Sequence, residues 1–167
     1  MSDEEKLILD CTCGGRTIWF QKDHPNCLYT DIREMPAGFD PSRPKFKVAP
    51  DAIMDYRDMD HPDESFYLVV WDPPHIKNLS PKSWFYKKYG SLNGETWAQD
   101  IKQGFIECMR VLKPNGTLII KWSHRKGDNR TVSLKEFLSV IPETPLFGHT
   151  TGSNSHTYWM TFMKIIK

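Results

Sequence analysis

Short apolar runs that each end in an aspartate are the feature that most constrains the fold of this chain. Residues 7–9, 27–30, 52–54 and 66–71 form such runs, and they are followed or closed by Asp10, Asp31, Asp55 and Asp72. Brief, continuously apolar segments of this kind predict buried parallel strands. The carboxyl ends of parallel strands meet at one edge of a sheet, where ligands bind in open α/β folds. We therefore expect the four carboxylates at a common ligand crevice, although each could instead cap a helix or end a solvated loop.

Helical patterns separate these runs and follow them. Residues 96–112 carry an apolar stripe that begins with a Thr96–Gln99 capping box, and shorter helices are expected at 17–20 and 133–140. Pro114–Gly116 predicts a turn into a strand at 117–122, and 146–150 with 157–163 predict a hairpin. Residues 33–50 contain four prolines and no helical stripe, so we expect a loop there. The predicted fold class is α/β, with a mostly parallel twisted sheet covered on both faces and an antiparallel C-terminal hairpin.

Composition limits the setting and the partners. A length of 167 residues suits a single domain over 1–167 with no separate target-recognition domain. The longest apolar run, residues 66–71, is far shorter than the roughly 18–20 residues of a membrane span. The acidic start shows no signal peptide, and four cysteines are too few for a disulfide scaffold, so we expect a cytoplasmic protein that does not bind membranes.

Charge divides unevenly along the chain. Residues 1–72 hold 8 Lys and Arg against 15 Asp and Glu, whereas residues 73–167 hold 14 against 6. This asymmetry indicates an anionic partner for the second half, unless the two halves neutralise each other within the fold. The oligomeric state cannot be deduced from it.

The turn that follows the first run, residues 10–16, contains a glycine pair that lets the backbone approach a ligand closely. It lacks the full G-x-G-x-x-G pattern, which disfavours a nicotinamide dinucleotide. A zinc site built from Cys11, Cys13, His24 and Cys27 is an alternative, but a C-x-C spacing inside a glycine turn matches zinc knuckles poorly. We therefore expect no metal.

Motifs in order along the chain resemble those of class I S-adenosylmethionine-dependent methyltransferases: 10–15, Asp31, Asp55, 72–75 and 110–117. The Asp-Pro-Pro-His tetrapeptide resembles the D-P-P-Y/F/W motif of the amino-methyltransferase branch, in the style of small stand-alone phage and bacterial members. The resemblance implies a Rossmann-like fold and S-adenosyl-L-methionine as cofactor. It also implies cofactor contacts from Asp10, Cys11, Thr12, Cys13, Gly14, Gly15, Asp31 (ribose), Asp55 and Tyr56 (adenine). Arg16 stands where many members have glycine, and His75 stands where an aromatic residue is usual.

The tetrapeptide contains groups suited to methyl transfer, in which the enzyme aims an amine lone pair at a methyl carbon. The Asp72 carboxylate and the Pro73 carbonyl can each accept one N–H of an exocyclic amine. Pro73 and Pro74 stiffen the turn. His75 can stack on a base or act as a donor or general base near neutral pH. A rigid turn without a catalytic role is the alternative.

Basic and aromatic residues alternate after this motif, as nucleic-acid strands require. We expect substrate contacts from Lys77, Trp84, Lys87 and Lys88, and from Trp122, His124 and Arg125 near a second basic loop. An amphipathic helix with its aromatics in the core is the alternative for the first segment. The predicted function is methylation of a base amine, adenine N6 or cytosine N4, in DNA before RNA. A small heterocyclic or amine substrate and a non-catalytic cofactor-binding subunit remain as rivals.

Overall fold

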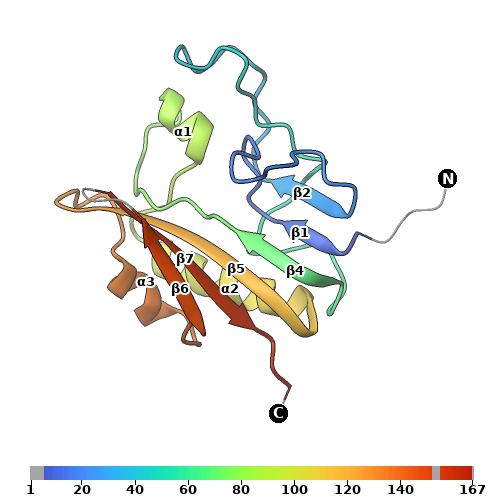
Figure 1. The fold of residues 1–167 in the computed structure, drawn as a ribbon. Helices are drawn as coiled ribbons and strands as arrows, with labels where there is room; N and C mark the ends of the chain where they lie inside the picture. The colour runs from blue at the N-terminus through green and yellow to red at the C-terminus, as the bar shows by residue number, and fades with distance from the viewer. Residues whose placement is uncertain (1–5, 152–154, 167) are drawn as a thin grey trace.

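One seven-stranded sheet organises residues 6–151 and 155–166, which are the residues that the computed structural model describes (Figure 1). Its strands are β1 (Ile8–Asp10), β2 (Cys27–Asp31), β3 (Ala52–Ile53), β4 (Phe66–Trp71), β5 (Leu112–Arg125), β6 (Phe147–Thr151) and β7 (Ser155–Met163). The helices are α1 (Trp84–Tyr89), α2 (Trp97–Val111) and α3 (Leu134–Val140).

The strand order is β3-β2-β1-β4-β5-β7-β6. Strands β1 to β5 pair in parallel, and β7 runs antiparallel to both β5 and β6. The predicted α/β class, the mostly parallel sheet and the C-terminal hairpin are thus confirmed. Both residues of β3 are exposed, because this two-residue strand forms the edge of the sheet rather than a buried strand.

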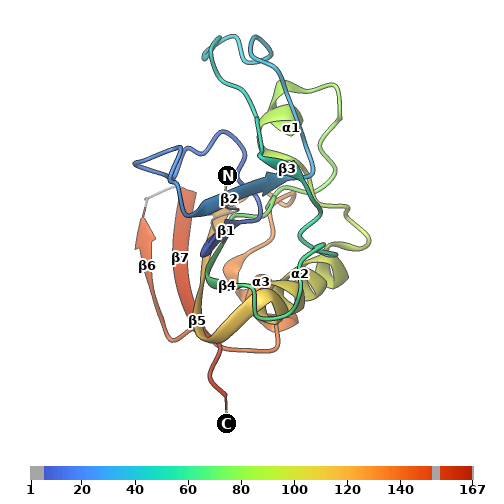
Figure 2. The same ribbon diagram turned by 90° about the vertical axis from the view of Figure 1, so that its right-hand side faces the viewer.

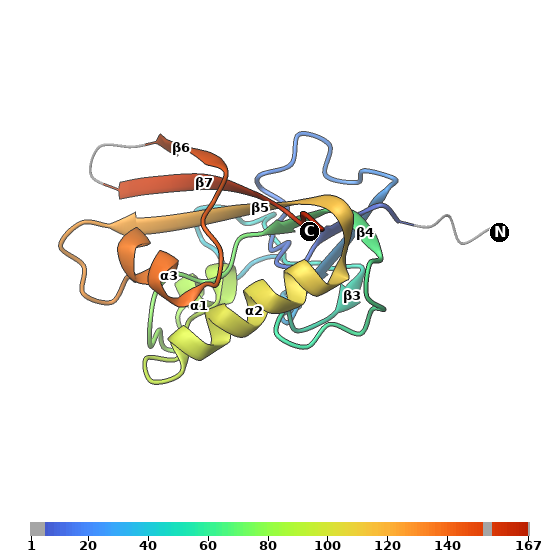
Figure 3. The ribbon, with the colours of Figure 1, turned by 90° about the horizontal axis from the view of Figure 1, so that it is seen from below.

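Helices α2 and α3 pack against the same face of the sheet (Figures 2 and 3). The buried stripe of α2 includes Ile101, Phe105 and Cys108, which join the main core. Within the described residues no helix covers the opposite face, so the expected two-sided covering is wrong. Over β1 and β2 a loop replaces it, and Trp19 packs there beside Tyr29.

Residues 17–20 form turns instead of the predicted short helix. Trp19 explains the difference, since its indole Nε1 donates to Asp10 Oδ2 over 2.7 Å and its ring meets Tyr29 edge-on. These tertiary contacts hold the segment in consecutive turns. The expectation of an irregular segment at 33–50 is confirmed, because no helix forms there.

The start of α2 also differs from its prediction. Thr96 is the N-cap residue but makes no side-chain cap bond to the helix backbone, so the Thr96–Gln99 capping box is wrong. Its Oγ1 instead donates to Asp100 Oδ2, and Asn93 Oδ1 accepts from the backbone N–H groups of Glu95 and Thr96. In contrast, α3 has a complete capping box between Ser133 and Glu136.

Trp122 lies in the core and not at a substrate surface, so its predicted substrate contact is wrong. Side chains alternate along β5, and Leu118, Ile120 and Trp122 point to the buried face. The Trp122 indole donates to the Val132 carbonyl over 2.9 Å, and its ring lies 4.4 Å from that of Phe137.

We expect Trp122→Ala to lower the free energy of unfolding by roughly 3–5 kcal/mol, the usual cost of emptying a buried aromatic site. The matched control is Trp84→Ala, because Trp84 is 45% exposed and its loss should cost less than about 1 kcal/mol. Urea unfolding followed by circular dichroism measures both. Equal losses would contradict the placement of Trp122 in the core.

Candidate functional site

Three cavities follow one another along the edge of the sheet where the parallel strands end. We call them the inner, central and outer cavities, with volumes of about 180, 550 and 610 Å³. Thr12, Arg33 and Asp72 line both the inner and the central cavity, and His75, Phe85 and Ser123 line both the central and the outer cavity. The Asp-Pro-Pro-His segment therefore lies at both junctions.

The turn after β1 joins the carboxyl ends of three strands. Thr12 Oγ1 accepts a hydrogen bond from the backbone N–H of Asp72 over 2.7 Å, which ties β1 to β4. The backbone N–H of Gly14 donates to Asp31 Oδ2 over 3.0 Å, which ties the turn to β2. The predicted cofactor residues of this turn line both spaces: Cys11 and Thr12 the inner cavity, and Thr12, Cys13, Gly14 and Gly15 the central cavity.

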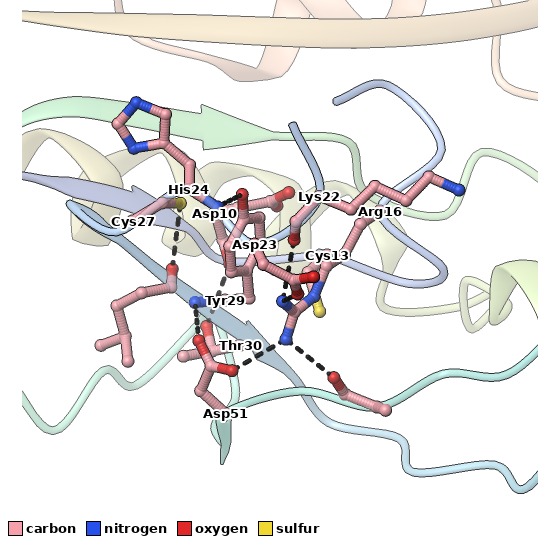
Figure 4. A network of polar contacts seen from close by, with 12 residues as sticks. Asp10, Cys13, Arg16, Lys22, Asp23, His24, Cys27, Tyr29, Thr30 and Asp51 are labelled. Carbon is pink, nitrogen blue, oxygen red and sulfur yellow. Dashed lines mark hydrogen bonds and ion pairs between the residues drawn. The ribbon is translucent and has the colours of Figure 1, made fainter. Parts of the chain in front are cut away.

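Arg16 takes the backbone conformation that glycine favours, with φ of +52°. Its guanidinium bonds to the carboxylates of Asp23 and Asp51 and to two backbone carbonyls, as Figure 4 shows. It also lies 3.9 Å from the centroid of the Tyr29 ring. These contacts hold the left-handed turn in place without glycine, and Arg16 lines neither the inner nor the central cavity.

Asp10 supports the turn from within. It is 1% exposed and lines none of the three cavities, so the predicted cofactor contact of its side chain finds no open surface. Its oxygens accept bonds from the Trp19 indole and the Thr12 backbone N–H. Burial raises the pKa of Asp10 to about 7, although these two hydrogen bonds oppose the shift.

Asp31 faces the inner cavity but is already paired. Arg33 Nε and Nη2 donate to its two oxygens, each over 2.9 Å, and the backbone N–H groups of Arg33 and Gly14 complete four bonds. Asp31 is 2% exposed, while the Arg33 side chain lines both the inner and the central cavity. A hydroxylated ligand at Asp31 therefore has to displace the Arg33 guanidinium.

Asp55 and Tyr56 separate in the structure. The Asp55 carboxylate takes a two-pronged bond from Arg57 and does not line the inner cavity, which departs from its predicted adenine contact. Arg57 also donates to Asp100 Oδ1 over 3.1 Å. Tyr56 does line the inner cavity, and its ring packs on Trp71.

Asp72 and Lys121 form an ion pair at the centre of the site. Lys121 Nζ lies 2.7 Å from Asp72 Oδ2, and each side chain is 23% exposed. Burial raises the pKa of Asp72, while the Lys121 charge and hydrogen bond act against that rise. Pro73 lines the central cavity and Pro74 the inner cavity, so the tetrapeptide crosses between them.

His75 is held as a neutral imidazole at pH 7. Burial, assisted by the Lys121 charge, lowers its pKa to about 4. Its ring lies edge-on to Trp122, at 6.3 Å between centroids. The predicted ability to act as a general base near neutral pH is therefore lost, whereas a wall or hydrogen-bonding position between the central and outer cavities remains.

The basic aromatic segment forms helix α1, but not with its aromatics in the core. Trp84 is 45% exposed and lines none of the three cavities, and Lys87 lines none either. Lys88 is buried, and its ammonium bonds to Asp40 Oδ2 over 2.8 Å. Lys88 lines the central cavity, but its charge is paired with Asp40 and connects α1 to the 33–50 loop. It is therefore not available to a substrate phosphate.

Of the remaining predicted substrate residues, two line the outer cavity and one lines no cavity. His124 and Arg125 line the outer cavity together with Arg130. Lys77 lines none of the three cavities, and its backbone N–H donates to the Arg130 carbonyl over 2.8 Å.

Lys121 and Arg33 are charged site residues that sequence reasoning missed. Lys121 had a usable signal, because it is the charged residue in an otherwise apolar run and alternates with the buried Ile120 and Trp122. Arg33 follows Asp31 by two residues in a proline-rich segment with no regular periodicity. Its two-pronged contact with Asp31 depends on a backbone bend at residue 32, which no sequence pattern predicts.

Comparison with solved structures identifies the fold. A S-adenosylmethionine-dependent methyltransferase from Methanosarcina mazei matches with a TM-score of 0.54 and 12% identity over 96% of this chain and 92% of that chain. The 1,6-didemethyltoxoflavin-N1-methyltransferase from Burkholderia thailandensis, solved with S-adenosylhomocysteine, matches at 0.54 and 17% over 95% and 71%. The [4+2]-cyclase SpnF matches at 0.59 and 12% over 96% and 74%.

These likenesses show that the chain has the class I methyltransferase fold, as its motifs predicted. Neither a sequence-family model nor a curated protein sequence matches it. Function has to come from the site, because one fold supports different chemistries.

Two further findings concern the described residues alone. None of their helices is long and apolar enough to cross a membrane. They also bring together no group of three or more His, Cys, Asp or Glu side chains that could hold a metal ion, and Cys11, Cys13, Cys27 and Cys108 are all buried free thiols.

The raised pKa of Asp10 predicts a pH-dependent stability. Between pH 3.8 and about 7 the Asp10 carboxyl is protonated in the folded state and ionised in the unfolded state. The stability that Asp10 contributes is therefore fully present below pH 3.8 and is lost as pH rises through about 7. We expect the free energy of unfolding of the wild type, relative to Asp10→Asn, to fall across this window. Urea unfolding of both proteins at a series of pH values measures the difference.

Asp40→Asn is the matched control, because the bonds from Lys88 and Ser42 lower the pKa of Asp40 to about 2. Its contribution is present above pH 3.8 and is lost as pH falls through about 2, which is the opposite direction. A pH-independent difference between wild type and Asp10→Asn would contradict the burial of an ionisable carboxyl at position 10.

Proposed function

We propose that this chain is a single-domain S-adenosylmethionine-dependent N-methyltransferase that modifies the exocyclic amine of a nucleic-acid base, adenine N6 or cytosine N4, in DNA before RNA. The observation that carries the proposal is the position of Asp72. Its side chain lies on the wall shared by the inner and central cavities, at the start of an Asp-Pro-Pro turn. A donor and an acceptor placed in the two cavities would meet at this residue. We place the activity in the cytoplasm, where four free thiols stay reduced.

The residues around the inner cavity fit the cofactor. Asp31 supplies carboxylate oxygens suited to ribose hydroxyls once Arg33 moves, and Ile32 and Tyr56 supply apolar and aromatic walls suited to adenine. The turn 11–15 opens toward the central cavity, where the methionine portion would lie. In this assignment Asp10 and Asp55 stabilise the surrounding backbone and do not contact the cofactor.

Bound S-adenosylmethionine supplies a methyl group whose bond to the sulfonium sulfur breaks as the bond to the acceptor nitrogen forms. Asp72 and the Pro73 carbonyl each accept one N–H of the acceptor amine and orient its lone pair. The prolines keep the turn rigid and have no backbone N–H that would compete. Asp72 Oδ1 lies opposite the oxygen held by Lys121 and is the group that takes the proton which the nitrogen releases. His75, neutral at pH 7, forms a wall beside the base.

Charge around the outer cavity supports a nucleic-acid substrate. Arg125 and Arg130 line it beside His124, and it opens directly from the central cavity through His75 and Phe85. Arg130 is paired with Asp128, but no carboxylate pairs with Arg125 in the part of the chain that the structure describes. Arg125 is thus the cation best placed to meet a phosphate next to the acceptor base.

A small heterocyclic amine is the second candidate substrate, because the central cavity, at about 550 Å³, is within the range that holds such molecules without any contribution from a polymer. Incubation of the protein with labelled cofactor and a panel of DNA, RNA and small amines separates the two. A chain that binds cofactor and transfers methyl to none of them would be a non-catalytic subunit.

Paired variants test the division between the cavities. We expect Asp72→Ala to abolish methyl transfer while the cofactor Kd changes by no more than a few-fold, since Asp72 orients the acceptor. Asp31→Ala should instead weaken cofactor binding by at least about tenfold, the usual cost of losing hydrogen bonds to a charged group. Isothermal calorimetry and a labelled-methyl assay give the two readouts.

Asp63→Ala is the control for both, because Asp63 lines none of the three cavities and its side chain is 75% exposed. Full turnover by Asp72→Ala would overturn the role of Asp72. An unchanged cofactor Kd in Asp31→Ala would remove Asp31 from the ribose site.

Salt dependence tests the nucleic-acid substrate. Phosphate contacts release counterions, so the affinity for a single-stranded oligonucleotide should fall steeply as salt rises. Arg125→Ala should reduce the slope of log K against log salt by about 1. Lys102→Ala, on an exposed position of α2, should leave the slope unchanged. Binding that is absent or independent of salt would favour the small-molecule substrate.

A further inference from the structure

Lys121 places a positive charge next to the carboxylate that the proposed function uses to hold the acceptor amine. Its Nζ lies 2.7 Å from Asp72 Oδ2. Both residues line the central cavity, and both side chains are 23% exposed. The pair is therefore neither sealed in the core nor fully solvated, but forms part of a cavity wall.

Strand pairing sets this arrangement. Trp71 of β4 pairs with Ile120 of β5 in parallel register, so the residues that follow them, Asp72 and Lys121, lie side by side at the carboxyl edge. Ile120 is fully buried on the helix-covered face, which directs Lys121 to the other side. A lysine at this position is thus held next to Asp72 by the backbone.

The pair retains unused hydrogen-bonding capacity. A lysine ammonium has three donor hydrogens, and a carboxylate can accept several bonds on its two oxygens. Among residues 6–151 and 155–166, Asp72 is the one side chain to which Lys121 donates, and no residue donates to Asp72 Oδ1. The wall therefore offers a substrate one anionic acceptor and one cationic donor, side by side.

We propose that Lys121 is a specificity-determining residue, which donates to a ring nitrogen of the substrate while Asp72 accepts from the amino group on the adjacent carbon. This inference rests on the proposed function and narrows it to substrates with an amidine edge, N–C=N. Adenine has this edge at N6 and N1, and cytosine has it at N4 and N3. Uracil, and guanine at O6 and N1, present a carbonyl next to a ring N–H, which reverses donor and acceptor. Guanine has an amidine edge only at N2 and N3, and aliphatic amines have no ring acceptor.

The position of His75 agrees with this assignment. His75 also lines the central cavity, and the Lys121 charge, added to burial, keeps its imidazole neutral. Lys121 is therefore the one cationic group that the tetrapeptide and the facing β5 residue present to the base at neutral pH. His75 therefore carries no positive charge that could compete with Lys121 for the ring nitrogen of the substrate.

Deaza substrates test the contact directly. The full chain is assayed for kcat/KM on two single-stranded oligonucleotides that differ only in one acceptor base, adenine or 1-deazaadenine, with a second pair containing cytosine or 3-deazacytosine. For each pair we compare the ratio of kcat/KM on the natural base to kcat/KM on the deaza base. We expect this ratio to be about tenfold or more higher for the wild type than for Lys121→Met, since the deaza base loses a hydrogen bond to a charged donor that only the wild type can make. Lys121→Arg, which keeps a cationic donor, should recover part of the preference.

The comparison between enzymes isolates the contact. Replacing a ring nitrogen with carbon also changes the intrinsic reactivity of the amine, but that change is the same for the wild type and for Lys121→Met. A lysine that only stabilised the fold would lower both rates together and leave their ratio unchanged. The cofactor Kd of Lys121→Met, measured by calorimetry, shows whether the inner cavity remains intact.

Each result has a distinct meaning. Equal natural-to-deaza ratios for wild type and Lys121→Met, with methyl transfer to the natural base intact, would overturn the role of Lys121 and leave the proposed function standing. Transfer to small aliphatic amines but to no base would overturn the proposed base substrate and this inference together.

Discussion

The parallel pairing of β1 with β4 and of β4 with β5 is the constraint on which the candidate site depends. It brings the ends of β1 and β4 beside the middle of β5, so the glycine turn, the Asp-Pro-Pro turn and Lys121 become neighbours although they lie far apart in the chain. The hydrogen bond from the Asp72 backbone to Thr12 Oγ1 fixes the first two at 2.7 Å. The inner and central cavities meet at this joint, and for that reason Asp72 faces both.

Three carboxylates at that edge are stabilised in different ways. Among the described residues Asp10 has no cationic partner, and burial raises its pKa to about 7. Asp31 is paired by Arg33 two residues away, whereas Asp72 is paired by Lys121 from the neighbouring strand. Only the last two leave a charged group in a cavity wall, and these are the two where a ligand can exchange contacts with the protein. The unequal charge of the two halves is partly neutralised within the fold in the same way, through Asp40 with Lys88, Asp63 with Arg110 and Asp72 with Lys121.

Much of the fold was predictable because its first four strands are short apolar runs that aspartates close or follow. The failures share a cause, since each depends on side-chain contacts that apolar periodicity does not encode. Trp19 is drawn out of a helix by Asp10 and Tyr29, and Thr96 exchanges its capping role for a bond to Asp100. Trp122 resembled a surface aromatic beside a basic loop, but strand alternation turns it toward Phe137 in the core.

The sequence by itself determined the succession of strands and turns along the chain and the location of the Asp-Pro-Pro motif at a strand end. The class I methyltransferase fold follows from them. These properties are local, since they depend on apolar periodicity and on residues that terminate strands. Which charges remain available to a ligand was decided only by the tertiary structure, because the partner of a buried charge is whichever opposite charge the sheet register brings within hydrogen-bonding distance. Lys88 was thereby committed to Asp40, and Lys121, which no motif marked, was placed beside Asp72.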